Sequence, residues 1–474
     1  MKIVMKFGGT SLADATAIKN AAGIVEQFHK GNRIAVVASA MNDTTDHLIK
    51  LGELAQKGQL WEAKNLLSRI QAAHLNATKS FAGTKTNHLA SKELLGKVNA
   101  LLSSLERSVE GIGQLRELTL RSRDYLLSFG ERLSVPILTT ALAQKGLKAQ
   151  AFTGADAGIV TDNNFGEAKP LAEISTHQIQ QRLGRLLEAG GLPVVTGFIA
   201  QNTDGNITTL GRGGSDYTAS LIGAALKADE VWIWTDVDGL MTADPRVVKD
   251  AVTLSNVSFG EALELSYFGA KMMHPRALQP AARHKIPVRI RNSSKPTFEG
   301  TLVSADQSTN NGKVAKAISI IKDVGIITVA GASMMGAPGV AAKIFQTLGI
   351  NGVNVVMISQ GSSEATISCV IAKKDVDRAV RSLQLSLMGQ GEVEKVTEEK
   401  DACVIAVVGS GMKGSPGVAA RVFTAVAKKN VNVRMIAQGT SEYNISFVVS
   451  DVDGPETVRA LHDEFQLGSK NQSS

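Results

Sequence analysis

The stretch VMKFGGTS, residues 4–11, decides how the first part of this chain folds. It begins as a hydrophobic run typical of a buried strand, carries one charged side chain, Lys6, and reaches two glycines. A helical pattern follows directly, so bare backbone N–H groups, a helix N-terminus and an ammonium group are expected at one point, which suits phosphate. A tight turn beside a surface lysine would give the same pattern, and the stretch alone leaves both interpretations open.

Short β-branched runs recur before residue 300 and alternate with stretches of helical spacing, such as residues 17–31 and 216–227. Residues 54–128 differ, because they lack strand signals and carry Leu and Ala at helical spacing. The alternation of strands and helices predicts a mainly parallel sheet that is covered on both faces. The stretch from 54 to 128 is predicted to be a helical insertion or flank.

An internal repeat follows a polar, aperiodic stretch at residues 296–316, which is the predicted domain boundary. GASMMGAPGVAAKIF begins at Gly331 and returns as GSGMKGSPGVAARVF at Gly409. VNVVMISQGSSEATISCVI begins at Val353 and returns in related form at Val431. Both pairs are 78 residues apart. A period of this length, present twice, predicts a duplicated small domain of the split βαβ type.

Composition and charge argue against several classes of function. The net charge is +7, but the 51 basic and 44 acidic residues are spread along the chain, and aromatic residues are only 4%, too few for base-stacking surfaces. Two cysteines, Cys369 and Cys403, cannot form a disulfide framework, and no metal-ligand spacing is found. No apolar run approaches the roughly 18 residues of a membrane helix. The sequence predicts a cytoplasmic protein without a nucleic-acid partner, a membrane partner or a dedicated metal site.

A second glycine-rich loop, TLGRGGSDYTAS at residues 209–220, also leads into a helix, with Ser215 or Asp216 placed to cap it. Arg212 stands between glycines, where its guanidinium is free to bind a carboxylate in a bidentate manner. Asp216 beside it would repel phosphate unless a cation were also bound. The pair therefore favours a zwitterionic substrate such as an amino acid, although a flexible turn with a helix cap is the simpler alternative.

Three further stretches carry candidate site residues. Glu131 lies in SFGERLS, and Thr235 and Asp236 end the buried strand of VWIWTDVDG, where α/β sheets place ligands. Lys271 lies in FGAKMMHPR, near a glycine-interrupted helix. A solvated glutamate on a helix face and turn-forming aspartates are the ordinary alternatives.

One stretch, GSGMKG at residues 409–414, matches the glycine spacing of a dinucleotide-binding loop. Its sister copy at residues 331–336 lacks the middle glycine, and the strand that follows ends without an acidic residue to hold a ribose. We therefore expect no dinucleotide site in the repeats.

Seven motifs, read in order, resemble those of aspartate kinases, and the resemblance covers essentially the whole chain. They are KFGGTS at 6–11, SAM at 39–41 followed by Thr45, SFGERLS at 128–134, TGFI at 196–199, TLGRGGSD at 209–216, WTDVDG and ADPR within 234–246, and FGAKMMHPR at 268–276. The paired repeats look like ACT domains. SQGSSE at residues 359–364 is similar to the form in threonine-sensitive members, and the chain resembles the monofunctional type.

This resemblance implies an α/β protein with three domains. Residues 1–300 would form the three-layer α/β/α amino-acid-kinase fold around a mainly parallel sheet. Residues 313–397 and 398–470 would form two C-terminal, ferredoxin-like (βαββαβ) ACT domains, which in this family regulate the enzyme and join copies into a homodimer or homotetramer.

The resemblance also implies a role for individual residues. L-aspartate would be held by Ser39, Thr45, Glu131, Phe198, Arg212, Ser215 and Asp216. ATP would be held by Lys6, Phe7, Gly8, Gly9, Thr235, Asp236, Met241, Arg246 and Lys271, and the family often has tyrosine where Met241 stands. The catalytic residues would be Lys6, Arg212, Asp216 and Lys271. An amino-acid effector, threonine rather than lysine, would bind near Met335, Gly336, Ala337, Gly339, Ile358, Ser359, Gln360 and Gln438.

The chemistry agrees with phosphorylation of the aspartate side chain to 4-phospho-L-aspartate, the first step towards lysine, threonine and methionine. The acceptor carboxylate has a reference pKa near 3.9, so it is ionised at neutral pH and requires no general base. Two anions must instead be aligned and neutralised, by lysines and by Mg²⁺ carried on the phosphates, which needs no cage made of protein alone. A kinase for glutamate or a similar acid, and a non-catalytic amino-acid sensor, are the alternatives.

Overall fold

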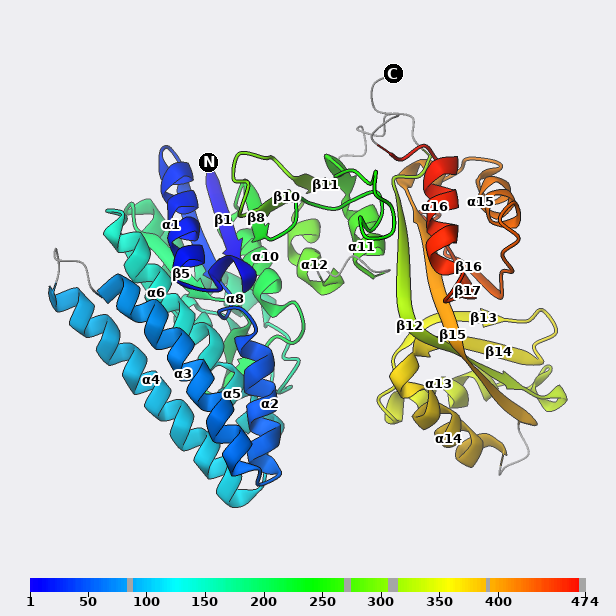
Figure 1. Ribbon diagram of the computed structural model, residues 1–474, viewed down its shortest axis with the longest axis horizontal. Helices are drawn as coiled ribbons and strands as arrows, with labels where there is room; N and C mark the ends of the chain where they lie inside the picture. The colour runs from blue at the N-terminus through cyan, green and yellow to red at the C-terminus, as the bar shows by residue number, and fades with distance from the viewer. Residues whose placement is uncertain (83–87, 268–273, 306–313, 389–392, 469–474) are drawn as a thin grey trace. The chain divides into compact units, whose positions relative to one another are not determined.

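The fold is described from a computed structural model of the chain (Figure 1). The structure describes residues 1–82, 88–267, 274–305, 314–388 and 393–468. These residues form two compact units, and each is described by itself. The first unit contains residues 1–240, 255–259 and 274–305, and the second contains residues 241–254, 260–267, 314–388 and 393–468.

The first unit is built on an eight-stranded sheet with the strand order β3-β5-β2-β1-β8-β10-β11-β9. The pairs from β3 to β10 are parallel, and only β11 runs antiparallel to β10. The prediction of a mainly parallel sheet is confirmed. The strands are β1 (Lys2–Phe7), β2 (Arg33–Ala38), β3 (Ala149–Phe152), β5 (Leu192–Thr196), β8 (Glu230–Thr235), β9 (Asn256–Ser258), β10 (Val288–Asn292) and β11 (Thr301–Ser304).

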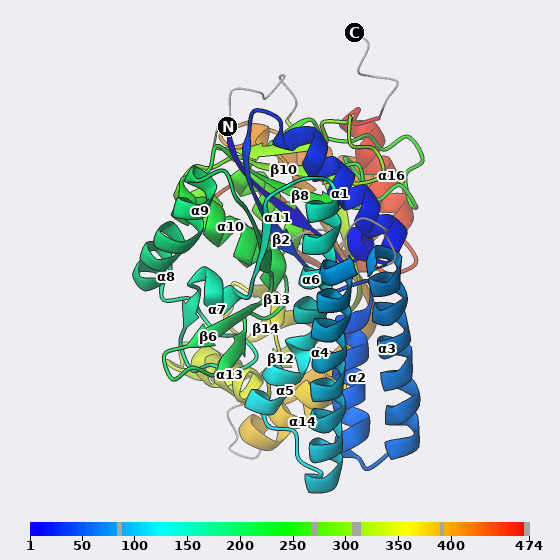
Figure 2. The same cartoon turned by 90° about the vertical axis from the view of Figure 1, so that its left-hand side faces the viewer.

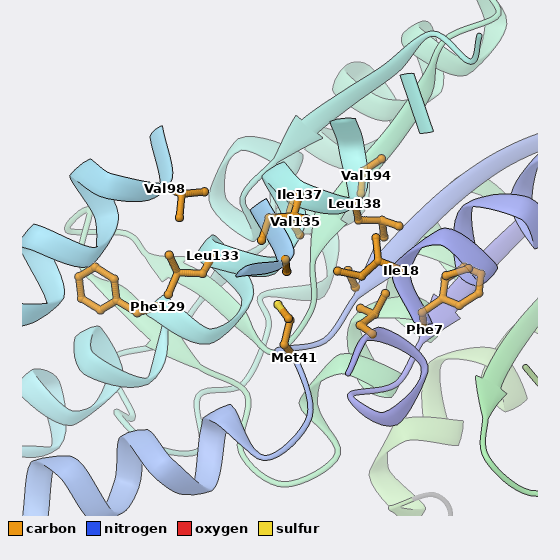
Figure 3. Packing of buried hydrophobic residues seen from close by; sticks show 14 of the residues in the cluster. Phe7, Ile18, Met41, Val98, Phe129, Leu133, Val135, Ile137, Leu138 and Val194 are labelled. Carbon is orange, nitrogen blue, oxygen red and sulfur yellow. The ribbon is translucent and has the colours of Figure 1, made fainter. Parts of the chain in front are cut away.

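Helices cover both faces of this sheet, and alternation along β1 assigns its side chains to the two faces. On one face Phe7 joins a large apolar cluster with Ile18 of α1 (Ala15–His29) and Leu138 of α6 (Phe129–Gln144), as Figure 3 shows. The opposite face is covered by α10 (Gly214–Leu226), which packs against β1 and β8. Lys6 therefore points away from the large core and towards α10.

The predicted helical stretch forms a layer of long helices (Figure 2). It contains α2 (Thr44–Gln56), α3 (Leu60–Ala82), α4 (His88–Leu115) and α5 (Leu120–Leu127). Their apolar faces extend the core cluster that surrounds α1 and α6. The remaining elements of the first unit are the 3-10 turn η1 (Thr10–Leu12), α7 (Gly154–Ala157), α8 (Ala172–Ile179), the π-helical turn Gln180–Gly184, α9 (Arg185–Glu188), α12 (Pro275–Arg283), and a small sheet of β4 (Val160–Thr161), β6 (Ile199–Asn202) and β7 (Ile207–Thr209).

The second unit is built on a six-stranded antiparallel sheet with the order β13-β14-β12-β15-β17-β16. Its strands are β12 (Ala317–Ala330), β13 (Val355–Gln360), β14 (Thr366–Ala372), β15 (Lys395–Val408), β16 (Met435–Gln438) and β17 (Asn444–Ser450). Its helices are α13 (Val340–Ile350), α14 (Val376–Leu387), α15 (Val418–Ala427), α16 (Gly454–Glu464) and most of α11 (Phe259–Tyr267).

The two long central strands are shared between the repeats. Residues 324–330 of β12 pair with β14 and with the first half of β15, whereas residues 317–321 pair with the second half of β15, at residues 404–408. The second repeat therefore takes its fourth strand from residues that precede the first repeat, and with this strand each repeat has the four strands and two helices of a βαββαβ domain. Residue 397, the predicted boundary between the repeats, lies inside β15.

Each repeat has its own apolar core. One cluster joins β12, β14, α13 and α14, and the other joins β15, β17, α15 and α16. Ala243 and Val248, from the segment 241–254, belong to the core of the second repeat. Over the part of the chain that the structure describes, no helix is both long enough and apolar enough to cross a membrane.

Candidate active site

A cavity of about 930 Å³ lies in the first unit, where β1, β7 and the loop after β2 end beside α2, α5 and α6. Its walls come from segments far apart in the sequence. All seven residues that the sequence assigns to the aspartate site line this cavity, together with Lys6 and Gly9: Ser39, Thr45, Glu131, Phe198, Arg212, Ser215 and Asp216. The fold thus brings the predicted substrate residues to one place.

Lys6 and Asp216 form an ion pair at the floor of this cavity. The Lys6 Nζ lies 2.5 Å from the Asp216 Oδ1, and the two residues are only 9% and 7% exposed. Asp216 stands in the first turn of α10, where the helix dipole favours a carboxylate. Asp216 gives the buried ammonium group of Lys6 a counter-charge, which explains why a buried strand can carry it. Removing one partner of a buried pair typically costs about 3–5 kcal/mol, because the other charge is then left uncompensated.

Glu131 is a buried carboxyl group with one unused oxygen. It is 2% exposed, and its Oε1 accepts a hydrogen bond of 3.1 Å from the Ala40 N–H. Its Oε2 has no hydrogen-bond partner among the described residues. Burial raises the pKa of Glu131 to about 8, because hydrogen bonds and the charge of Lys6 offset only part of the cost of desolvation. A cation that enters the cavity would therefore find an acceptor that the fold leaves open.

The loop that carries Arg212 is fixed by close backbone packing. Gly213 has a φ of +73°, and a Cβ there would lie 2.5 Å from the His274 Cβ. Phe198, at φ +65°, accepts from the Leu210 N–H through its carbonyl oxygen at 2.9 Å. The Arg212 side chain is exposed and has no hydrogen-bond or ion-pair partner within the described residues. Arg212 is thus an unpaired cation on a well-placed backbone.

Gly9 lies where β1 approaches the loop after β2. A Cβ at Gly9 would lie 2.8 Å from the Asn42 carbonyl oxygen and 3.2 Å from that of Ala40, so a side chain is excluded. The Gly8 N–H donates to the Trp234 carbonyl oxygen at 3.1 Å. The Phe7 side chain is fully buried and stacks on the Trp234 ring, so it does not face the cavity.

The remaining residues assigned to ATP, as far as the structure describes them, are not among those that line this cavity. Thr235 and Asp236 follow the end of β8 in the first unit, and the Thr235 Oγ1 donates to the Asp236 Oδ1 at 3.1 Å. Met241 and Arg246 belong to the second unit, where the Arg246 guanidinium is exposed and bound to Asp244. Lys271 lies outside the described residues.

Sequence reasoning missed several residues around these groups. Asp124, Arg123, Asn42 and Glu167 also line the cavity. Asp124 follows an arginine within an ordinary helical pattern, so only its spacing from Glu131, two helical turns later, could have drawn attention to it.

The residues assigned to an effector lie in the second unit. Met335, Gly336, Ala337 and Gly339 form the loop before α13, and Ile358, Ser359 and Gln360 end the edge strand β13. The Gly336 N–H donates to the Glu364 Oε2 at 3.1 Å, which joins this loop to the turn after β13. Gln438 holds the same place as Gln360 in the second repeat, at the end of β16, and β13 and β16 lie close together.

The comparisons with known proteins agree with this arrangement. The chain matches the amino acid kinase family over residues 1–292 and the ACT domain over residues 327–387 and 405–465. The fold and the cavity therefore define an amino acid kinase that carries paired ACT domains.

The similar proteins identify the subgroup of amino acid kinases to which the chain belongs. Aspartokinase 2 of Bacillus subtilis is 34% identical over 100% of this chain and 99% of its own length, and the chloroplastic aspartokinase 1 of Arabidopsis thaliana is 34% identical over 98% of this chain and 80% of its own. The structure of E. coli aspartokinase III in complex with aspartate and ADP superimposes with a TM-score of 0.81 at 30% identity, over 98% of this chain and 99% of that one. The chain belongs to the aspartokinase family and is a phosphotransferase. It spans half of the bifunctional aspartokinase/homoserine dehydrogenase 1 of Zea mays.

Proposed function

We propose that this kinase transfers the γ-phosphoryl group of ATP to the side-chain carboxylate of L-aspartate, giving 4-phospho-L-aspartate for lysine, threonine and methionine synthesis. We propose further that threonine inhibits it through the ACT domains. One observation carries the first proposal: a single cavity holds the unpaired guanidinium of Arg212, the open carboxyl oxygen of Glu131 and the ammonium group of Lys6.

These three groups match the charges of the reactants. Arg212 can bind the α-carboxylate of aspartate with two parallel N–H donors. The Glu131 Oε2 can accept from the α-ammonium group, and the incoming cation would then favour the ionised form of Glu131. The side-chain carboxylate is left to face Lys6 and the nucleotide.

The reaction then depends on position and charge. The acceptor carboxylate is ionised at neutral pH, so no residue has to remove a proton. Lys6 would stabilise the charge that spreads over the transferring phosphoryl group, because its ammonium group is buried and already fixed by Asp216. Its three N–H donors allow it to keep Asp216 and still reach a phosphate oxygen.

The residues present are compatible with Mg²⁺ carried by the nucleotide. Mg²⁺ usually takes one or two carboxylates and completes its shell with phosphate oxygens and water. Asp216 provides one carboxylate beside Lys6, and no group of three or more potential ligands is found among the described residues. When bound, Mg²⁺ would supply further positive charge to the phosphate oxygens.

The effector proposal is supported by the turn SQGSSE in the first repeat. The acidic side chain of this turn, Glu364, is already bound to the Gly336 N–H. The turn otherwise offers neutral hydroxyl and amide groups, which suit the hydroxyl of threonine better than a second ammonium group. Lysine remains the comparison to make, because a structure of E. coli aspartokinase III holds lysine and aspartate.

The copies of the chain are proposed to associate through the ACT domains as a homodimer or homotetramer. Ile358 on β13 and Ile436 on β16 are each 48% exposed, and both belong to edge strands of the six-stranded sheet. Unpaired strand edges with apolar side chains are surfaces that pair readily.

One assay tests the reaction and the effector. The acyl phosphate is trapped with hydroxylamine, with aspartate or glutamate as acceptor and with threonine or lysine added. We expect the acyl phosphate to be trapped with aspartate but not with glutamate, and we expect threonine to inhibit its formation. Trapping only with glutamate would contradict the proposal that aspartate is the substrate. Arg212→Ala should raise the aspartate KM about tenfold or more, because a charge-assisted pair is lost. Arg69→Ala, an exposed arginine on α3, is the matched control and should leave it unchanged.

A further inference from the structure

Asp124 lines the cavity but touches none of the groups discussed above. It lies on α5, is fully buried, and accepts three hydrogen bonds. Its Oδ2 accepts from the Gly166 N–H and the Thr209 N–H, both at 2.9 Å, and its Oδ1 accepts from the Thr209 Oγ1 at 2.7 Å. No cation forms an ion pair with it within the described chain. A buried carboxylate without a counter-charge is costly, so its three donors must hold it firmly.

These bonds join three segments at the wall of the cavity. Asp124 comes from the helical layer, Gly166 from the loop after β4, and Thr209 from the end of β7. The Ala168 N–H also donates to the Thr209 carbonyl oxygen at 2.9 Å. A Cβ at Gly211, where φ is +75°, would lie 3.2 Å from the Glu167 Cγ, so the next turn packs on the same loop.

Thr209 is three residues before Arg212, and the chain between them turns out of the sheet. Because the Arg212 side chain has no partner of its own within the described residues, its position depends on where this turn begins. Asp124 fixes that point through both the backbone and the side chain of Thr209.

We propose that Asp124 is a positioning residue for aspartate binding, which acts through Thr209 to place Arg212 over the substrate α-carboxylate. The inference rests on the proposed function of Arg212. It assigns the helical layer a part in substrate recognition, because Asp124 is the group through which α5 holds the Arg212 loop.

The asparagine variant separates this role from a need for charge. An amide oxygen can accept from both N–H groups, and the amide NH₂ can donate to the Thr209 hydroxyl, so all three bonds can be kept. Asp124→Asn is therefore expected to bind aspartate within about threefold of the wild type, whereas Asp124→Ala loses every bond. Bonds to a buried charged group are each worth enough to change binding about tenfold.

The experiment measures kcat and the KM for aspartate and for ATP in the full-length enzyme. Asp124→Ala should raise the aspartate KM about tenfold or more and leave the ATP KM within about twofold. Thr209→Val, which removes one donor, should raise the aspartate KM about threefold, and it provides the test if Asp124→Ala fails to fold. In an Arg212→Ala background, Asp124→Ala should change the aspartate KM less than about twofold, because the two residues act in series.

Several results would overturn the proposal. They are an unchanged aspartate KM in both Asp124→Ala and Thr209→Val, a parallel rise in the ATP KM, an asparagine variant as weak as the alanine variant, or full additivity with Arg212→Ala. Failure of the proposed function would look different: the aspartate KM would then be insensitive to Arg212→Ala itself.

Discussion

Glycine-rich loops before helices occur in both units, but the charges around them differ. In the first unit, the loop before α10 places the buried carboxylate of Asp216 against Lys6 at the cavity. In the second unit, the Gly336 and Gly414 N–H groups donate to the turn residues Glu364, which is exposed, and Glu442, which is half-buried. The carboxylate beside the loop therefore binds a lysine side chain in the first unit, whereas the carboxylates in the second unit bind backbone N–H groups of the loops themselves.

The two repeats also differ in the bond at the start of each glycine-rich loop. In the first repeat, the Ala332 N–H donates to the Glu394 Oε1 at 2.9 Å, and Glu394 is exposed and lies within that repeat. At the equivalent place in the second repeat, the Ser410 N–H donates to the Glu261 Oε1 at 2.7 Å. Glu261 comes from α11, is fully buried, and pairs with Lys316 at 3.0 Å. The second repeat is thus anchored to α11, and a carboxylate stands at the GSGMKG loop where a dinucleotide would place its phosphates.

The largest effect should come from the positive charge of the cavity. We expect Lys6→Met to lower kcat about 10³-fold, because the group that stabilises the transferring phosphoryl charge is removed. Steady-state kinetics measures this, with Lys2→Met at the other end of β1 as the matched control. Normal turnover by Lys6→Met would show that the positive charge of Lys6 beside the loop before α10 is not needed for catalysis. A thermal melt would show that the variant is folded.

The next largest effect should come from Glu261, which binds the loop of the second repeat, and it can be compared with that of Glu394 in the first repeat. Glu261→Ala leaves the Lys316 ammonium group buried without this carboxylate, and we expect the free energy of unfolding of the second unit to fall by about 3 kcal/mol. Glu394→Ala removes a bond at the surface and should cost about 0.5 kcal/mol.

Denaturant unfolding can separate these changes from those in the first unit. All three tryptophans, Trp61, Trp232 and Trp234, lie in the first unit, so a transition seen by far-UV circular dichroism but not by tryptophan fluorescence reports on the repeats. Equal losses of unfolding free energy in Glu261→Ala and Glu394→Ala would show that Glu261 on α11 stabilises its repeat no more than the exposed Glu394 does.

Much of the fold could be predicted from local patterns. Hydrophobic runs and helical spacing identified the parallel sheet and the helical layer, because these signals depend on neighbouring residues, and the similarity of two stretches 78 residues apart identified the repeats. The sharing of β12 could not be predicted, because the pairing of residues 317–321 with 404–408 is a contact between segments far apart in sequence. No signal within either repeat shows which strand completes it.

The candidate site shows the same limit. Motifs identified nine of the residues that line the cavity, but the Lys6–Asp216 pair joins residues 210 positions apart, and the sequence assigned them to different reactants. Phe7 shows that neighbours in sequence need not face the same way, because strand alternation turns its side chain to the opposite face of the sheet from that of Lys6.

Gln360 at the end of β13 tests the proposed effector site in the first repeat. Gln360→Ala should raise the threonine concentration for half-inhibition about tenfold, within the usual range of allosteric coupling. Gln438→Ala should raise this threonine concentration less, because the loops of the second repeat carry different side chains from those of the first. Lys413 and Tyr443 replace Met335 and Ala365 of the first repeat, and the Lys413 Nζ lies 6.0 Å from the Tyr443 ring centre.

Inhibition curves at fixed aspartate measure both changes, and Gln384→Ala, an exposed glutamine on α14, serves as the matched control. If Gln360→Ala remained fully inhibited by threonine, the effector site would have to lie elsewhere.

The smallest effect concerns pH and the buried carboxyl group of the cavity. The pKa of Glu131 is about 8 in the folded chain, against about 4.5 for an ordinary glutamate, so only the folded state holds the proton between these values. The stability that this proton provides is complete below about pH 4.5, falls as the pH rises above that value, and is gone once the pH has passed about 8. Without aspartate, the free energy of unfolding should fall by about 1.4 kcal/mol between pH 7 and pH 9, because over these pH values the folded chain holds on average about half a proton more than the unfolded chain.

Urea unfolding followed by tryptophan fluorescence at these pH values isolates the first unit. Glu131→Gln should remove the pH-dependent loss, because an amide does not titrate, whereas Glu173→Gln, an exposed glutamate on α8, should keep it. A slope shared by all three proteins would assign the pH dependence to other groups. A loss confined to the proteins that retain Glu131 would show that the catalytic unit keeps a buried acid without a cation, whereas in the second unit the buried Glu261 is paired with Lys316.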